Sequence, residues 1–169
     1  MTIKVVASSQ VKTTYNFTET SSTSVRSNLE TVNSAPAYTY GSGNFEINAG
    51  VKNTGVLPSG GATIIDLASM SSTSFGVTST IAFTGVKNVT VYNTSTVKNR
   101  DINIRATGSN AFTNIFNGGS GNLLIKPYSS FSYSDPYSLA VTGSQKNISL
   151  FDVSGSGATY EICVLGNIA

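Results

Sequence analysis

Short segments in which apolar and polar residues alternate follow one another from residue 62 to the end of the chain. Segments 87–93 (KNVTVYN) and 158–166 (ATYEICVLG) carry an apolar side chain at every second position, which is the period of a β-strand. Turns containing Gly, Asn, Ser or Pro separate these segments. About eight or nine such segments at even spacing are typical of a β-sandwich or barrel.

We therefore predict an all-β fold, an antiparallel β-sandwich that is jelly-roll-like, with an immunoglobulin-like sandwich left open as the other topology. The composition agrees with this prediction. Only 11% of the residues are charged, against roughly 25% in ordinary soluble proteins. Eight Tyr, eight Phe and many Val and Ile argue against disorder, because disordered chains are poor in aromatic and β-branched residues.

The chain divides by pattern into two parts. Residues 61–169 hold the regular strand segments and are predicted to form the sandwich domain. Residues 1–60 are rich in Ser and Thr and show two or three isolated strand-like segments, so we predict an N-terminal extension or arm. Its strands either add to the edges of the sandwich or form an arm that pairs with a neighbouring subunit, and the sequence leaves both open.

Residues 87–106 are interpreted as a hairpin, two strands joined by a polar turn, and the Gly-rich turn 154–157 predicts a second hairpin. In the first, Val89 and Val91 share one face and Ile102 and Ile104 another, which predicts a wall of the core. The opposite face is a candidate contact surface for a neighbouring subunit, with plain exposure to water as the alternative. The candidate interface residues are Val11, Tyr15, Phe17, Asn88, Thr90, Tyr92, Asn103, Arg105, Phe131 and Tyr133.

The inventory of reactive side chains does not point to catalysis. The chain has no His, its eight acidic residues are dispersed, and its single cysteine, Cys163, has no partner for a disulfide or a base to activate it. We therefore predict no enzymatic activity, no catalytic or metal-binding residues and no cofactor.

The charge and hydropathy of the chain argue against binding to nucleic acid and against insertion into a membrane. The net charge is +2 and the basic residues are scattered, so we expect no nucleic-acid binding. No long apolar run occurs, so we expect no membrane span, and the N-terminus lacks the apolar core of a secretory signal. The four Asn-x-Ser/Thr sequons are accordingly expected to stay without sugar.

Aromatic side chains gather in 126–137 (KPYSSFSYSDPY), where Tyr128, Phe131, Tyr133 and Tyr137 occur within ten residues. Such a cluster, with Asn and Asp nearby, suits a sugar platform. Because alternation puts Phe131 and Tyr133 on one face, they suit core packing or a subunit contact at least as well.

Residues 86–169 resemble small bacteriophage structural proteins found in virions as head-decoration or other accessory components. The similarity lies in the succession VKNVTVYNTSTVKNRDINIRATG, NAFTNIFNGGSGNLLIKPYSSF and a closing TYEICVLG after a Gly-rich turn. It implies a β-sandwich virion protein without enzymatic activity.

We accordingly expect a capsid decoration or cement protein, assembled in the host cytoplasm. It would act as a homo-oligomer, with a trimer as the first hypothesis, on a major capsid protein. The alternative is a receptor- or glycan-binding module of a phage tail or fibre.

Overall fold

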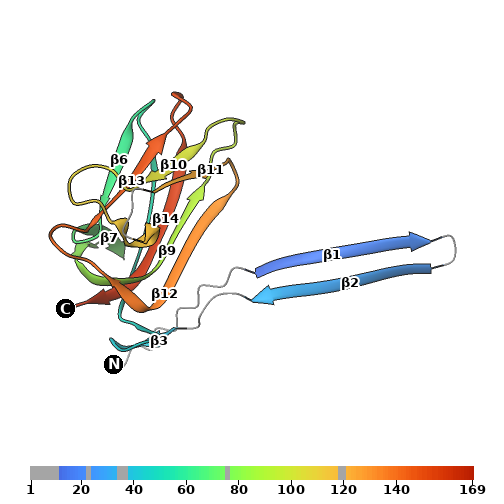
Figure 1. Ribbon diagram of the computed structural model, residues 1–169, viewed down its shortest axis with the longest axis horizontal. Helices are drawn as coiled ribbons and strands as arrows, with labels where there is room; N and C mark the ends of the chain where they lie inside the picture. Colours follow the sequence, from blue (N-terminus) through green and yellow to red (C-terminus); the bar gives the residue numbers. More distant parts are fainter. Residues whose placement is uncertain (1–11, 22–23, 34–37, 75–76, 118–120) are drawn as a thin grey trace.

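The computed structural model describes residues 12–21, 24–33, 38–74, 77–117 and 121–169. The described elements are β-strands and one short 3-10 helix, so the prediction of an all-β fold is confirmed. Two four-stranded antiparallel sheets form a sandwich (Figure 1). No helix in the described part of the chain is long and apolar enough to cross a membrane.

The strand order defines the two sheets. Sheet I has the order β12-β9-β14-β5 and sheet II the order β11-β10-β13-β6. Sheet I consists of β5 (Ala49–Val56), β9 (Phe83–Asn93), β12 (Ser130–Ala140) and β14 (Thr159–Ile168). Sheet II consists of β6 (Ala62–Asp66), β10 (Ile102–Arg105), β11 (Asn122–Ile125) and β13 (Asn147–Asp152).

This order is that of a jelly roll. Taken along the chain, the eight strands pass back and forth between the sheets, and only β10 and β11 are consecutive strands that pair with each other. The result is two sheets built from nested Greek keys. An immunoglobulin-like sandwich, whose sheets divide the strands differently, does not fit.

Both predicted hairpins are wrong, because in each case the two strands lie in different sheets. Strand β9 lies in sheet I and β10 in sheet II, so residues 94–101 cross between the sheets. The same holds for β13 and β14, joined by residues 153–158. A strand with one apolar face satisfies the same alternation whether its sequence neighbour lies beside it or across the core, so the pattern alone could not separate the two arrangements.

The core lies between the sheets. Val89 and Val91 from sheet I and Ile102 and Ile104 from sheet II are fully buried and belong to one apolar cluster. The 3-10 helix η1 (Thr113–Phe116) closes one end. Phe112 and Ile115 are buried in the cluster, and Phe116 packs against it.

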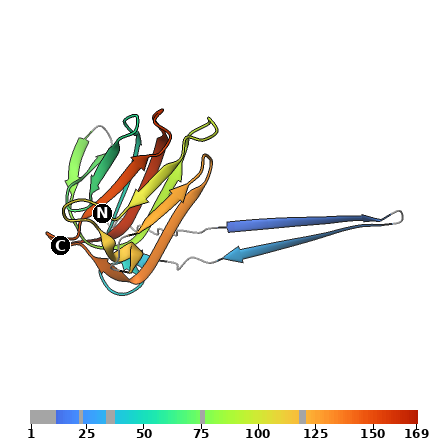
Figure 2. The same ribbon diagram turned by 45° about the horizontal axis from the view of Figure 1, so that its top comes forward.

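The N-terminal section takes part in two separate structures. Strand β5, which lies within the predicted extension 1–60, pairs with β14 and forms an edge of sheet I. Strands β1 (Lys12–Ser21) and β2 (Ser24–Asn33) instead pair with each other over their whole length. Both views show this hairpin extending away from the two sheets (Figures 1 and 2).

Two further strand pairs flank the sandwich. Strands β3 (Thr39–Tyr40) and β4 (Glu46–Ile47) form a short parallel bridge just before β5. Strands β7 (Met70–Ser74) and β8 (Val77–Ile81) form an antiparallel pair between β6 and β9 in the chain.

Candidate functional site

Four connections between the sheets are tied together at one end of the sandwich, which we call the loop end. They are the β5–β6, β9–β10, β11–β12 and β13–β14 connections, residues 57–61, 94–101, 126–129 and 153–158. Hydrogen bonds from a few buried polar side chains join them in pairs. The loop end is therefore a preorganised surface, of the kind on which a rigid scaffold presents binding residues.

Asp152 holds two of these loops together. Its carboxylate accepts hydrogen bonds from the Gly60 amide at 3.0 Å, the Gly157 amide at 2.9 Å, and both the amide and the hydroxyl of Ser154 at 3.0 and 2.6 Å. Burial opposes ionisation, but the bonds from Ser154, Gly60 and Gly157 favour the carboxylate and lower the pKa of Asp152 to about 2. The Asp152 carboxylate therefore stabilises the loops through these hydrogen bonds.

Asn93 and Ser95 hold the other two loops. The Asn93 amide donates to the carbonyls of Arg100 at 2.7 Å and Ile125 at 3.0 Å, and its oxygen accepts the Ser95 N–H at 3.1 Å. The Ser95 hydroxyl accepts the Thr159 N–H at 2.9 Å. Asn93 belongs to one of the sequons, and its side chain is buried and fully engaged.

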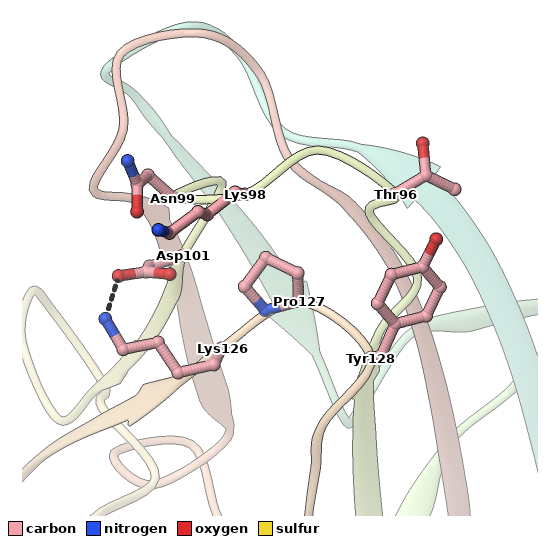
Figure 3. Close-up of a pocket in the computed structure, with 7 residues that line it drawn as sticks. All are labelled: Thr96, Lys98, Asn99, Asp101, Lys126, Pro127 and Tyr128. Carbon is pink, nitrogen blue, oxygen red and sulfur yellow. Dashed lines mark hydrogen bonds and ion pairs between the residues drawn. The ribbon is translucent and has the colours of Figure 1, made fainter.

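A hollow of about 410 Å³ opens beside these loops (Figure 3). On one side Lys126 Nζ lies 2.6 Å from Asp101 Oδ2. Asp101 is 8% exposed, and its Oδ1 has no hydrogen-bond partner within the described residues. On the other side stands Tyr128, 63% exposed. The lining residues are Thr96, Lys98, Asn99, Asp101, Lys126, Pro127 and Tyr128.

Two of the lining residues have an unusual backbone. Asn99 has φ 70° and Tyr128 has φ 59°, in the left-handed region. Asn adopts this conformation readily, whereas a tyrosine there is uncommon. The β9–β10 loop also borders a second hollow of about 490 Å³, which shares Lys98 and Asn99 with the first and reaches Val153 and Ser154.

The outer face of sheet I is polar and largely satisfied by its own bonds. The Asn88 amide donates to Ser134 Oγ at 2.7 Å and to the Tyr133 carbonyl at 3.2 Å, and Thr90 Oγ1 lies 2.9 Å from Ser132 Oγ. Of the candidate interface residues on this face, Asn88 is therefore buried and Thr90 is engaged.

Tyr92 is half-buried on the same outer face and is registered between Ser130 and Glu161. Glu161 itself forms an exposed ion pair with Lys52 at 2.9 Å. Among Asn88, Thr90 and Tyr92, it is thus Tyr92 whose side chain takes no part in the hydrogen bonds that Asn88 and Thr90 form within the described residues.

The outer face of sheet II carries apolar residues instead. Ile64 is 52% exposed and Leu124 48% exposed. In the register, Asn103 lies between Leu124 and Phe151, and the Arg105 guanidinium sits 3.6 Å above the Phe151 ring. The predicted contact surface is therefore split, with Asn103 and Arg105 on the face opposite to Asn88, Thr90 and Tyr92.

The remaining candidate interface residues lie elsewhere. Val11 lies outside the described residues, and Tyr15 and Phe17 are positions of β1, paired with Glu30 and Asn28. Phe131 and Tyr133 are registered opposite the buried Val91 and Val89 and pack against the core.

The aromatic cluster of 126–137 is thereby dispersed. Phe131 and Tyr133 face the core, while Tyr128 precedes β12 and Tyr137, 70% exposed, lies towards its far end, where its ring meets Phe45 edge-on at 6.3 Å. The cluster predicted from the sequence does not form one sugar platform, and Tyr128 belongs to the loop end alone.

The reactive side chains do not converge. Cys163 lies on the outer face of sheet I, between Thr90 and Lys52, and burial together with the charge of Glu161 raises the pKa of its thiol. Within the described residues, no three His, Cys, Asp or Glu side chains gather where they could hold a metal ion.

Comparisons with known proteins add little to this picture. No protein-family model matches the chain, and no curated protein matches it. Among solved structures, the mitogen derived from Yersinia pseudotuberculosis is similar over 70% of this chain and 86% of its own, at 13% identity and a TM-score of 0.36.

The exposed apolar residues of sheet II were not predicted, although the sequence carried a signal for them. Segments 62–66 (ATIID) and 122–125 (NLLI) place apolar residues at adjacent positions, so an apolar residue of each segment must point outwards. These outward residues are Ile64 and Leu124. The hollow had no such signal, because its residues come from two loops that are distant in sequence.

Proposed function

We propose that this protein is a non-enzymatic structural protein of a bacteriophage virion, a capsid decoration or cement protein that packs against copies of itself and a major capsid protein. The similarity of residues 86–169 to small phage virion proteins supports the proposal. The jelly roll also supports it by analogy, since this fold recurs in viral shells as well as in lectins.

The observation that carries the proposal is the difference between the two outer faces. On the outer face of sheet I, Asn88 and Thr90 bond to each other and to β12, whereas sheet II has Ile64 and Leu124 half-exposed on its two edge strands, β6 and β11, and Phe151 on β13 between those edges. Large apolar residues exposed on one face with polar residues around them suit a protein contact surface. We therefore assign the subunit contact to the outer face of sheet II.

A buried polar atom on the same face supports this assignment. Asn103 is buried between Leu124 and Phe151, and its Oδ1 has no hydrogen-bond partner within the described residues. Buried polar oxygens are normally paired, so a donor from a neighbouring subunit or from water is expected there. Arg105, stacked on Phe151, offers a cation at the rim of the contact.

The β1–β2 hairpin is assigned the role of an arm. Its strands pair with each other and extend from the sandwich, so their outer edges can add to a neighbour by strand pairing (Figure 2). In this proposal the arm links subunits of a homo-oligomer, with a trimer as the working hypothesis, and the face of sheet II supplies the apolar part of the contact.

The test substitutes the exposed apolar residues of sheet II. The double variant Ile64→Lys, Leu124→Lys is expected to keep its melting temperature within a few degrees, because both side chains are half exposed. It is expected to lose self-association in sedimentation velocity and co-sedimentation with virions. The matched control is Val56→Lys on β5, an apolar residue that is 67% exposed on sheet I. Unchanged assembly of the double variant would refute the role of this face.

The arm is tested separately by deleting residues 1–20 and then 1–33. Weaker self-association with a retained melting transition is expected from both. If oligomeric state and virion binding survive both deletions, the arm has no part in assembly.

A receptor- or glycan-binding module of a tail or fibre is the second candidate. The open hollow between Asp101 and Tyr128 favours it, because this hollow sits at the loop end, away from the face of sheet II.

A further inference from the structure

We propose that the hollow at the loop end is a binding site for an uncharged saccharide, in which Asp101 accepts a sugar hydroxyl and the Tyr128 ring carries the sugar's apolar face. The site uses none of the residues assigned to the subunit contact. The inference therefore holds for a decoration protein and for a tail component alike.

The first argument is the free oxygen of Asp101. One oxygen of this carboxylate is paired with Lys126, and Figure 3 shows the other turned towards the space between Lys98 and Pro127. This second oxygen is buried and accepts no hydrogen bond from the described residues. An unpaired buried acceptor is costly, and a hydroxyl donor entering the hollow would satisfy it.

The second argument is the set of groups around that oxygen. Thr96, Lys98, Asn99 and Tyr128 line the same hollow, and Figure 3 shows no hydrogen bond that joins these four side chains to one another. They combine hydroxyl, amide and ammonium groups, so the site offers donors as well as acceptors. A polyol, whose every hydroxyl both donates and accepts, matches such a mixed set.

The third argument is the rigidity of the aromatic residue. Tyr128 is held at φ 59° while its amide donates to the Asn93 carbonyl at 2.9 Å, and Asn93 is itself fixed by three side-chain hydrogen bonds. Residues in sparsely populated backbone regions persist only where the surrounding structure fixes them, and they cluster at active sites and ligand clamps. The ring stands exposed at the rim, as a stacking platform requires.

Charge and size select the ligand class. The carboxylate of Asp101 is paired with Lys126, so these two charges offset each other, and the free oxygen of Asp101 calls for a neutral donor such as a hydroxyl. A hollow of about 410 Å³ lies in the range of small-ligand sites and has room for a mono- or disaccharide.

The test begins with the full chain on an array of neutral, sialylated and phosphorylated oligosaccharides. The best neutral sugar is then titrated at millimolar concentration while amide NMR shifts are followed. Shifts confined to residues 96–101 and 126–128 are expected. Tyr128→Gly, which removes the ring and suits the positive φ, and Lys98→Ala should each weaken binding at least tenfold.

Tyr137→Ala is the matched control, because Tyr137 is 70% exposed against 63% for Tyr128 but lies outside the hollow, and this variant should bind as the unmodified protein does. Three results would overturn the proposal: no binding to any neutral sugar, shifts that map elsewhere, or binding that survives both loop-end substitutions. Binding of only acidic glycans, abolished by salt, would also overturn it and mark a lysine-based anion site.

Discussion

The Asp152 carboxylate and the Gly60 amide meet at 3.0 Å although 92 residues separate them. This bond joins the start of the β13–β14 loop to the β5–β6 loop. The N–H groups of Gly157 and Ser154 donate to the same carboxylate. Two of the four loops at the end of the sandwich that bears the proposed saccharide site are therefore held together by one ionised side chain.

Replacing Asp152 with Asn should cost about 2 kcal/mol of unfolding free energy at neutral pH, since an amide nitrogen would oppose N–H donors and charge-assisted bonds would be lost. Because the pKa of Asp152 is lowered in the fold, its contribution is present above about pH 4 and is lost as the pH falls towards 2. Denaturant unfolding from pH 7 to pH 2 checks both points.

In that experiment the variant should show a flatter loss of stability between pH 4 and pH 2 than the unmodified protein. Glu161→Gln, which removes a charge from an exposed ion pair, is the control and should change stability little. A variant as stable as the parent at pH 7 would contradict the role given to Asp152.

Asn93→Ala should destabilise the protein by about 2 kcal/mol, because it leaves the buried carbonyls of Arg100 and Ile125 and the Ser95 amide without their partner. The melting temperature, followed by circular dichroism, measures the loss. Asn122→Ala on the exposed surface of β11 serves as the control. Equal melting temperatures for the two variants would mean that these bonds add nothing.

Gly166→Ala should destabilise by about 1–3 kcal/mol through overpacking. At Gly166 an added Cβ would overlap the carbonyl oxygen of Gly85 on the neighbouring strand, at a point where the register of β14 and β9 shifts. Gly143→Ala is the control, since no atom lies near its Cβ position. Chemical denaturation measures the unfolding free energy of both variants. A Gly166→Ala variant as stable as the unmodified protein would show that the two strands can separate at little cost.

Cys163 should react slowly with iodoacetamide at neutral pH, because burial raises the pKa of its thiol and so lowers the thiolate fraction. The rate, measured by mass spectrometry, should rise with pH and rise sharply when guanidinium unfolds the chain. As the chain has one cysteine, the signal is unambiguous. Labelling of the folded protein as fast as that of the unfolded chain would contradict this expectation.

Much of the fold was predictable from alternation alone. The pattern of Val89 and Val91, and of Ile102 and Ile104, correctly predicted which side chains enter the core, because the period of a strand sends every second residue to the same side. The adjacent apolar pairs Ile64–Ile65 and Leu124–Ile125 also indicated that one residue of each pair points away from the core. Only the structure showed that both outward residues lie on sheet II.

The sequence by itself therefore determined the class of fold and, for most strands of the sandwich, which side chains face the core, since these depend on local periodicity and turn chemistry. Only the tertiary structure decided which strands are neighbours. It placed β9 and β10 in opposite sheets, which sent Thr90 and Arg105 to opposite surfaces. It also brought Asp101 and Tyr128 to one hollow. Such contacts depend on how whole strands pair and cross the core, and that choice is made by the packing of the entire chain.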